Sequence, residues 1–410
     1  MRVRRMQLRR PWSSVPLAAV VLLFSAQGLA IASPADSEPT ADASSDDDDD
    51  FDAPGPVDRK PRISGVLAAS HRTTLFDDNK LPDGEPLPDE YTFQVEHTHL
   101  KFSGDLTEKL SWEVLPCVTH MNGFSVITAH FSYEIARPLH ITFGRFLLPF
   151  GQFNVRSLPG SFGTVSRPLL YQSHEDRTIT VAGATPRTFI FSPRDDTGVL
   201  ASGSLWFGAD DTVQLSYSAY FTNGLRGTSD TMARFWDDNN NGKQLGGRIS
   251  LRYNGSKLTA TIGASGLTNQ YERSLAQRAW GVDFALAFQY ATARRVSLRG
   301  EWVDTSREIV PNKELDKGDA GTSGAYVTVE AAITDTLGVF YQFDTLTERV
   351  PHAMLNEGFR DLELTTNRHV AGVSVALEQF LHVRLEYGRW LEPLGVPNAH
   401  RVSLQTIVSF

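Results

Sequence analysis

The sequence has few of the residues that several fold classes require. One cysteine among 410 residues excludes an internal disulfide and leaves no cysteine cluster for a structural zinc site. Mean hydropathy is −0.24, which excludes a multi-helix inner-membrane protein, because each spanning helix needs about 20 consecutive apolar residues. The net charge of −9 argues against a general nucleic-acid binder, whose surface is normally basic. A soluble β-rich protein or a membrane barrel is left.

The only apolar run that approaches a membrane span lies at the N-terminus. Five arginines within the first ten residues precede an apolar stretch over residues 15–25, and Ala30-Ile31-Ala32 forms an A-x-A cleavage site. Residues 1–32 are therefore predicted to be a signal peptide, with the mature chain beginning at Ser33. A membrane helix is the alternative, but the run is short and ends in small residues. No cysteine stands directly after the cleavage site, which argues against a lipoprotein.

Residues 33–60 form an acidic segment rich in Ser, Pro, Ala and Asp, with five consecutive aspartates at 46–50. Such a composition buries too little apolar surface to offset the entropy of ordering, so we predict that this segment is disordered. The aspartate run could collect divalent cations, although a solvated run is the commoner case. Without the signal peptide, 34 basic residues face 48 acidic ones, a net charge of −14.

From residue 61 onward, segments of about ten residues alternate apolar with polar or small side chains, the period of a strand with two different environments. Residues 244–253 show the pattern, with Leu, Ile and Tyr on one face and Gln, Arg and Ser on the other. Sixteen such strands are predicted: 61–71, 91–104, 108–118, 123–134, 138–147, 196–207, 211–223, 244–254, 256–267, 279–290, 294–305, 323–334, 336–347, 367–377, 380–390 and 400–410.

The connections between these strands alternate in length. The joints after even-numbered strands are short, and those after odd-numbered strands are mostly long: 72–90, 148–195, 224–243, 268–278, 306–322 and 348–366. This alternation is typical of a transmembrane barrel with short periplasmic turns and long extracellular loops. A soluble sandwich is the alternative, but it has no reason to sort its loops in this way. We therefore predict an all-β fold, a 16-stranded antiparallel transmembrane β-barrel over residues 61–410.

Two sets of residues add a family resemblance. In the last strand Val402, Leu404, Thr406, Val408 and the terminal Phe410 share one face, which resembles the C-terminal strand of bacterial outer-membrane proteins. In those proteins the terminal Phe is the signal for the barrel-assembly machinery. Further segments resemble the phosphate-selective porins O and P: Leu100–Leu106 leading into Leu110–Trp112, Gly144–Phe146 before Pro149–Gly151, and Gly246–Arg248.

This resemblance implies a channel in the outer membrane of a Gram-negative bacterium, in contact with lipid and lipopolysaccharide and assembled as a homotrimer. It also implies that the longest loop, 148–195, folds into the lumen and narrows it. That loop carries a net +2 from five arginines against three acids, which would favour anions at a constriction. The candidate anion-binding residues are Arg156, Arg167, Arg177, Arg187 and Arg194. Loop 72–90 carries −4 and is expected to face the exterior, binding divalent ions between lipopolysaccharides.

Alternation along the strands predicts which charged side chains line the lumen. Basic candidates are Lys101, Arg248, Arg252, Lys257, Arg295, Arg299, Arg384 and Arg401. Acidic candidates are Glu113, Glu134, Asp283, Glu301, Glu330, Asp344 and Glu386. Eight against seven is nearly balanced, so the arginines either form a selective basic track or pair with carboxylates across strands. A phosphate-selective porin implies a dense ladder of arginines and lysines, whereas this set is modest.

Motifs for metal binding or catalysis are weak. Asp237, Asn239, Asn241 and Gly242 match the start of a calcium loop, but Arg248 occupies its twelfth position, so a solvated turn is favoured. His97 and His99 share a strand face without an assigned third ligand, so lumen-lining polarity is favoured over a metal site. No catalytic constellation is evident, although Asp344 and Glu386 would form a carboxylate pair if their strands aligned in height.

These observations predict a passive diffusion channel for small hydrophilic solutes, with a preference for anions that extends to phosphate-type anions. No enzyme activity, cofactor or metal is predicted. Two alternatives stay open, a barrel enzyme such as a phospholipase or protease whose extracellular loops carry the site, and a plugged barrel that serves as an adhesin or scaffold.

Overall fold

The computed structural model describes residues 61–78, 89–119, 123–158, 160–171, 195–208, 211–224, 242–271, 275–291, 294–309, 318–351, 361–393 and 397–410. The predicted signal peptide and acidic segment, residues 1–60, lie outside these ranges. So do Arg177, Arg187 and Arg194, and most of the calcium-loop match.

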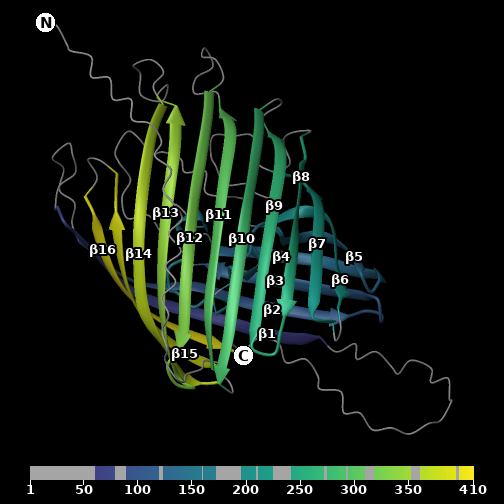
Figure 1. The fold of residues 1–410 in the computed structure, drawn as a ribbon, viewed down its shortest axis with the longest axis horizontal. Coiled ribbons are helices and arrows are strands. Elements are labelled where there is room, and N and C mark those ends of the chain that lie inside the picture. The colour runs from purple at the N-terminus through teal and green to yellow at the C-terminus, as the bar shows by residue number, and fades with distance from the viewer. Residues whose placement is uncertain are drawn as a thin grey trace, which may run out of the picture.

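Sixteen strands form one closed antiparallel barrel in which each strand pairs with the next and β1 pairs with β16 (Figure 1). This confirms the predicted fold class. The strands are β1 (Arg62–Phe76), β2 (Glu90–Asp105), β3 (Leu110–Thr119), β4 (Gly123–Ala136), β5 (Leu139–Leu147), β6 (Asp195–Phe207), β7 (Val213–Thr222), β8 (Gln244–Asn254), β9 (Leu258–Tyr271), β10 (Leu275–Ala291), β11 (Arg294–Ile309), β12 (Gly318–Ala332), β13 (Leu337–Pro351), β14 (Asp361–Glu378), β15 (Leu381–Leu391) and β16 (Ala399–Ser409).

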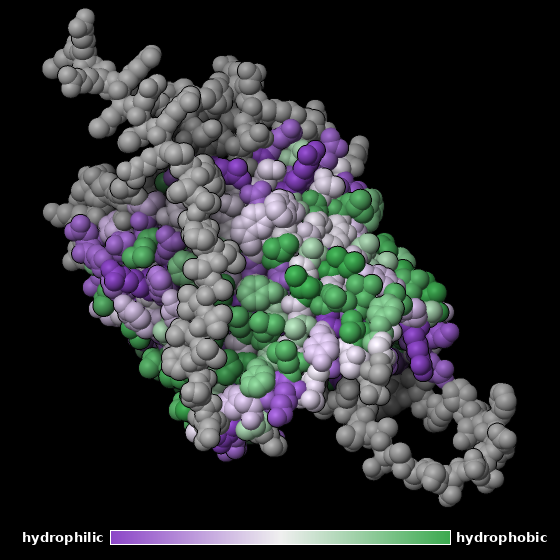
Figure 2. All heavy atoms as spheres, in the orientation of Figure 1, coloured by the Kyte–Doolittle hydropathy of each residue, from purple (hydrophilic) through white to green (hydrophobic). Residues whose placement is uncertain are grey.

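The alternation of the sequence becomes an alternation of environment. Along β15, Arg384, Glu386 and Trp390 are buried inside the barrel, whereas Leu385 and Tyr387 between them are exposed on its outer face. Exposed apolar side chains lie on the outer surface of the other strands as well, and Figure 2 shows them as a band between more polar ends. An apolar outer band of this kind suits lipid, and the polar inner face suits water. In the part of the chain that the structure describes, no helix is long and apolar enough to cross a membrane.

Several predicted strand boundaries are wrong, because polar residues facing the lumen were taken for loop residues. The connections predicted at 306–322 and 348–366 shrink to residues 310–317 and 352–360. The connection predicted at 268–278 shrinks to residues 272–274, since Thr268 pairs with Arg278 and the ladder continues to Leu275. Strand β1 extends to Phe76, so Arg72 belongs to the barrel wall and not to the acidic first loop. A polar side chain on the inner face does not destabilise a strand, because the lumen itself is polar.

The C-terminal residue closes the barrel. Gly65 donates its backbone N–H to the carbonyl of Phe410 at 2.8 Å, and Phe410 donates back to Gly65 at 3.1 Å. The Phe410 side chain is 65% exposed on the outer face, in line with Val402 and Leu404. The terminal aromatic therefore ends the strand that joins the two ends of the sheet.

Candidate constriction inside the barrel

The segment that follows β5 lies inside the barrel. Residues 148–171, called the inner segment below, contain two short 3-10 turns, η1 (Asn154–Arg156) and η2 (Leu169–Tyr171). The segment begins with the mostly apolar run Leu-Pro-Phe-Gly-Gln-Phe at residues 148–153, directly after β5 has ended. Apolar side chains from both ends of the segment form one buried cluster with inward side chains of the wall, namely Phe150, Phe153, Leu169, Leu170 and Tyr171 with Leu267, Val303, Tyr326, Leu346 and Trp390.

One buried carboxylate of the wall holds the first turn of the inner segment. Glu301 on β11 accepts the backbone N–H groups of Gln152 at 3.2 Å and of Phe153 at 3.3 Å, and also the hydroxyl of Tyr171. Burial raises the pKa of the Tyr171 phenol well above its usual value, and the Glu301 carboxylate raises it further, so this hydroxyl keeps its proton and donates. The backbone N–H of Gly151 is satisfied by Ser265 Oγ on β9 at 2.9 Å.

Three more wall carboxylates hold the rest of the segment. Glu330 on β12 accepts the N–H of Gly163 at 3.2 Å, and Asp344 on β13 accepts that of Leu169 at 3.1 Å. Glu386 on β15 accepts the N–H groups of residues 165 and 166 at 2.6 and 3.1 Å, together with the Ser166 hydroxyl. Hydrogen bonds to a charged acceptor are stronger than neutral ones, so these carboxylates dock the backbone of the segment firmly.

Wall arginines bind the carbonyl groups of the same segment. Arg384 Nη1 donates to the carbonyl of Thr164 at 3.2 Å, and Arg368 on β14 donates to the carbonyl of Arg167. Arg368 also pairs with Asp344 at 2.8 Å, with both side chains fully buried. The inner segment therefore runs from β5 across the interior to the wall formed by β9–β15, where both backbone donors and acceptors are bound.

The predicted basic wall residues divide into three groups. Lys101, Arg248 and Arg299 pair with Glu113, Asp283 and Glu330 at 2.6, 2.5 and 3.2 Å, as the pairing alternative expects. Arg384 and Arg401 are buried, the latter donating to Thr74 Oγ1 at 3.2 Å and lying over the Trp390 ring. Three others lie near the short turns, are exposed and make no ion pair in the part of the chain that the structure describes: Arg252, Lys257 and Arg295.

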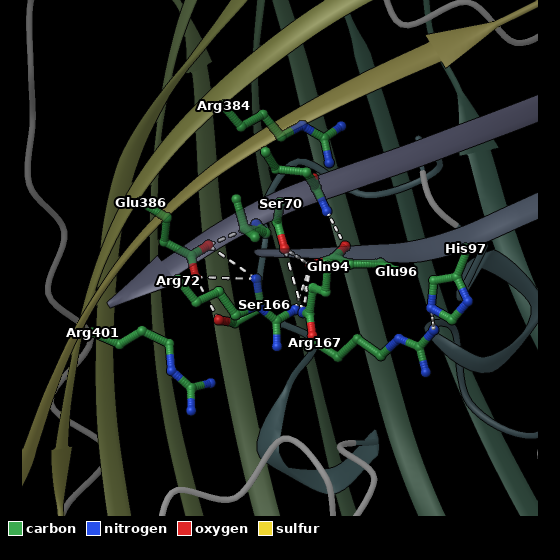
Figure 3. Close-up of polar contacts among 12 residues, drawn as sticks. Ser70, Arg72, Gln94, Glu96, His97, Ser166, Arg167, Arg384, Glu386 and Arg401 are labelled. Atoms are coloured by element: carbon green, nitrogen blue, oxygen red, sulfur yellow. Dashed lines mark hydrogen bonds and ion pairs between the residues drawn. The ribbon is translucent and has the colours of Figure 1, made fainter. Parts of the chain in front are cut away.

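Two predicted constriction arginines lie in the described part of the inner segment. Arg156 ends η1 and is exposed. It lines a cavity between the segment and the wall together with Arg299, Glu330 and Gln342, so the fold brings a predicted loop arginine and a predicted wall arginine to one site. Arg167 is half-buried, and its Nη2 lies 2.9 Å from His97 Nε2 (Figure 3).

Several charged residues that face the barrel interior were not predicted from the sequence. Arg72 on β1 pairs with Glu96 on β2, and both lie close to the inner segment in Figure 3. Arg145 on β5 pairs with Asp195, and Arg368 is described above. Arg368 falls at an inward position of a predicted strand, so counting alternate residues would have found it. Arg145 would not be found in this way, because Gly144 has φ +122° and interrupts the alternation.

Burial changes the charge that the lumen presents. Four of the seven predicted acidic wall residues are buried, namely Asp283, Glu301, Asp344 and Glu386, but only two of the eight basic ones are, namely Arg384 and Arg401. The buried carboxylates bind backbone N–H groups or guanidinium groups instead of facing the lumen. The near balance of the sequence therefore becomes an excess of accessible basic side chains.

The structure shows where the side chains of the carboxylate pair and of the histidine pair lie. Asp344 and Glu386 do not form a carboxylate pair, because Asp344 is bound to Arg368 and Glu386 to the inner segment. The pair His97 and His99 does gain a third metal-ligating neighbour, the lone Cys117 on β3, which is far from both in sequence. The expectation that no third ligand lies near this pair is wrong, since strand pairing places His99 opposite Cys117.

Comparison with known proteins supports the fold. No family model matches the sequence, and no curated protein matches it. Among solved structures, OmpF of Salmonella typhi in complex with daunomycin has 14% identity and a TM-score of 0.54, covering 86% of this chain and 98% of that one. OprB of Pseudomonas putida has 10% identity and a TM-score of 0.55, covering 85% and 94%.

A loop-deletion mutant of OmpT, an outer membrane protein of Vibrio cholerae, has 8% identity and a TM-score of 0.52, covering 86% of this chain and 99% of that one. At these identities the likeness concerns the fold. This chain therefore shares the fold of these three proteins over nearly their whole length.

Proposed function

We propose that this protein is an outer-membrane channel through which small hydrophilic solutes diffuse, and that it prefers anions. The barrel encloses a polar interior, and the inner segment crosses that interior and occupies part of its cross-section. A docked segment with an exposed arginine is suited to narrowing and charging a pore. The passage of solutes needs no covalent chemistry, and none is proposed.

The observation that carries the anion preference is the unequal burial of the two charges. Most of the predicted acidic wall residues hold the inner segment, whereas Arg156 is exposed and lines a cavity together with Arg299. Accessible Arg and Lys side chains at a constriction select anions, because they raise the local anion concentration and repel cations. Exposed Arg252, Lys257 and Arg295 near the short turns add positive charge along the same wall.

The surroundings of the channel follow from its outer face. The apolar band in Figure 2 suits the lipid and lipopolysaccharide of a Gram-negative outer membrane, and the terminal Phe410 suits recognition by the barrel-assembly machinery. One structural neighbour, OmpT of Vibrio cholerae, is described in a trimer form. We propose a homotrimer for this protein too, with cross-linking in membranes as the test.

Single-channel recording in a planar bilayer tests the function. Under a salt gradient, the wild-type protein should give discrete conductance steps and a reversal potential that shows a preference for anions. Arg156→Ala should lower the anion-to-cation permeability ratio several-fold, and the control Arg389→Ala should not, because Arg389 is exposed on the outer face. Replacing chloride with phosphate then measures whether phosphate is preferred, as the resemblance to phosphate-selective porins suggests.

Two results would overturn the proposal. A reversal potential that shows cation preference in the wild type would be compatible with a channel but would contradict the proposed basic constriction. An absence of open steps from correctly folded protein would remove the channel itself and favour a plugged barrel or a barrel enzyme.

A further inference from the structure

We propose that His97, His99 and Cys117 form a binding site for a divalent transition metal of the zinc type, and that metal binding displaces Arg167 from His97. The three side chains come from the paired strands β2 and β3, on the inner face of the barrel. Their ligand atoms all lie within 4.8 Å of one another. Imidazole nitrogen and cysteine sulfur are the ligands that zinc prefers in proteins.

The strand geometry explains why these residues meet. His99 and Cys117 are directly opposite each other in the β2–β3 ladder, and His97 lies two residues earlier on the same face as His99. The two histidine rings have their centroids 5.1 Å apart, and Cys117 Sγ lies 3.8 Å from His97 Nδ1. Two ligands of one tetrahedral zinc lie about 3.6 Å apart when one is sulfur and one nitrogen, so that distance already fits.

The surroundings favour a specific site over a solvated cluster. His99 and Cys117 are buried, and Cys117 packs against Leu115 and Ile127, with Leu158 of the inner segment at the edge of this apolar group. A dry and rigid setting holds the side chains in place and strengthens the attraction between a thiolate and a cation. A three-ligand set also leaves one coordination position open for water or an anion from the lumen.

Arg167 couples this site to the inner segment. Its Nη2 lies 2.9 Å from His97 Nε2, and a guanidinium can only donate, so Nε2 carries the lone pair and Nδ1 carries the proton. A metal that binds Nε2 takes the place of Arg167. A metal that binds Nδ1 moves the proton to Nε2, which then no longer accepts from Arg167. Either way metal binding breaks this contact, so the guanidinium behaves as an internal competitor for the metal.

Metal binding can be measured on the folded full-length barrel without any channel assay. Calorimetry with zinc, after chelation under reducing conditions, should give one ion per chain. Cys117→Ser and His99→Gln should each weaken binding at least tenfold, whereas His140→Gln, which changes a histidine outside the cluster, should not. The unheated gel mobility of each variant shows whether it folds. Less than one zinc per chain in the wild type, or unchanged affinity in folded Cys117→Ser, would overturn the site.

A cobalt spectrum needs no variant and therefore stays informative if a substitution prevents folding. Because Cys117 is the only cysteine, a thiolate-to-cobalt charge-transfer band in the wild-type barrel can come from this side chain alone. The appearance of that band at one cobalt per chain supports the proposal. Its absence at saturating cobalt would overturn it.

The displacement of Arg167 has its own test. Arg167→Ala removes the internal competitor and should tighten zinc binding several-fold, whereas Arg156→Ala on the same segment should leave it unchanged. Equal affinities of wild type and Arg167→Ala would overturn the displacement. A change of ion selectivity on adding zinc, lost in Cys117→Ser, would extend the effect to conduction, and this last readout alone depends on the proposed channel.

Discussion

At the scale of single residues, Gly151 shows how closely the inner segment fits the wall. Its φ is +63°, and an added Cβ would lie 1.8 Å from Glu301 Oε1 and 2.7 Å from the Tyr171 hydroxyl. Only a glycine both adopts this backbone conformation without strain and leaves room for the carboxylate. Glu301 can therefore reach the N–H groups of the next two residues.

We expect Gly151→Ala to loosen the inner segment and to raise single-channel conductance, because the methyl group pushes Glu301 away from its donors. Gly160→Ala is the matched control. Gly160 also has a positive φ, of +89°, but an added Cβ there meets nothing within 4 Å. Both variants share a backbone cost of about 1–2 kcal/mol. Equal conductance of the two variants would show that the contact with Glu301 does not set the width of the pore.

At the scale of elements, the inner segment depends on buried charges of strands far from it in sequence. Glu386 is 1% exposed and accepts from two consecutive backbone N–H groups and one hydroxyl. Each hydrogen bond to a charged group contributes about 1.5–3 kcal/mol, so this carboxylate is a strong tether. Docking of the segment and packing of the wall are therefore one cooperative unit.

Glu386→Gln keeps the shape of the side chain but removes its charge and one acceptor oxygen. We expect this variant to lose about 1–3 kcal/mol of unfolding free energy and to show frequent conductance fluctuations as the segment detaches. Denaturant unfolding in detergent and single-channel recording measure the two effects. Glu363→Gln, an exposed position on β14, is the control and should behave as wild type. If Glu386→Gln has the unfolding free energy of the wild type and no additional conductance fluctuations, the other contacts of the inner segment are enough to hold it in place.

At the scale of the whole molecule, barrel closure depends on the pairing of β16 with β1. Two backbone hydrogen bonds between Gly65 and Phe410 end this pairing, and they do not involve the Phe410 side chain. That side chain projects from the outer face. The ring lies over Gly65 of β1, where an added Cβ would come within 2.5 Å of Phe410 Cζ, but the backbone hydrogen bonds that end the pairing do not require it.

We expect Phe410→Ser to lower the amount of folded protein in the outer membrane several-fold and to leave refolding in detergent unchanged. Phe380→Ser, at an exposed aromatic in the turn between β14 and β15, should change neither. Heat-dependent gel mobility of membrane fractions and of refolded samples measures both quantities. Equal membrane levels of wild type and Phe410→Ser would argue against the assembly signal.

The limits of sequence analysis appear at particular residues. The barrel was predictable because most of each strand keeps a period of two, and the wrong boundaries at 268–278 did not change the number of strands. The pairing of Arg248 with Asp283 could not be predicted, because alternation gives the face of a residue but not its height along the barrel. Cys117 was missed for the same reason, since only the strand register places it opposite His99.

The sequence by itself determined the fold class, the number of strands and, where no bulge interrupts the alternation, the face on which a side chain lies, because these depend on local alternation and on the length of the connections. Only the tertiary structure decided which charges are buried and which are accessible. Wall carboxylates on β11, β12, β13 and β15 became binding sites for backbone donors of the inner segment, because a buried N–H group requires an acceptor and these were within reach. The charge of the lumen was thus set by contacts between residues more than 100 positions apart.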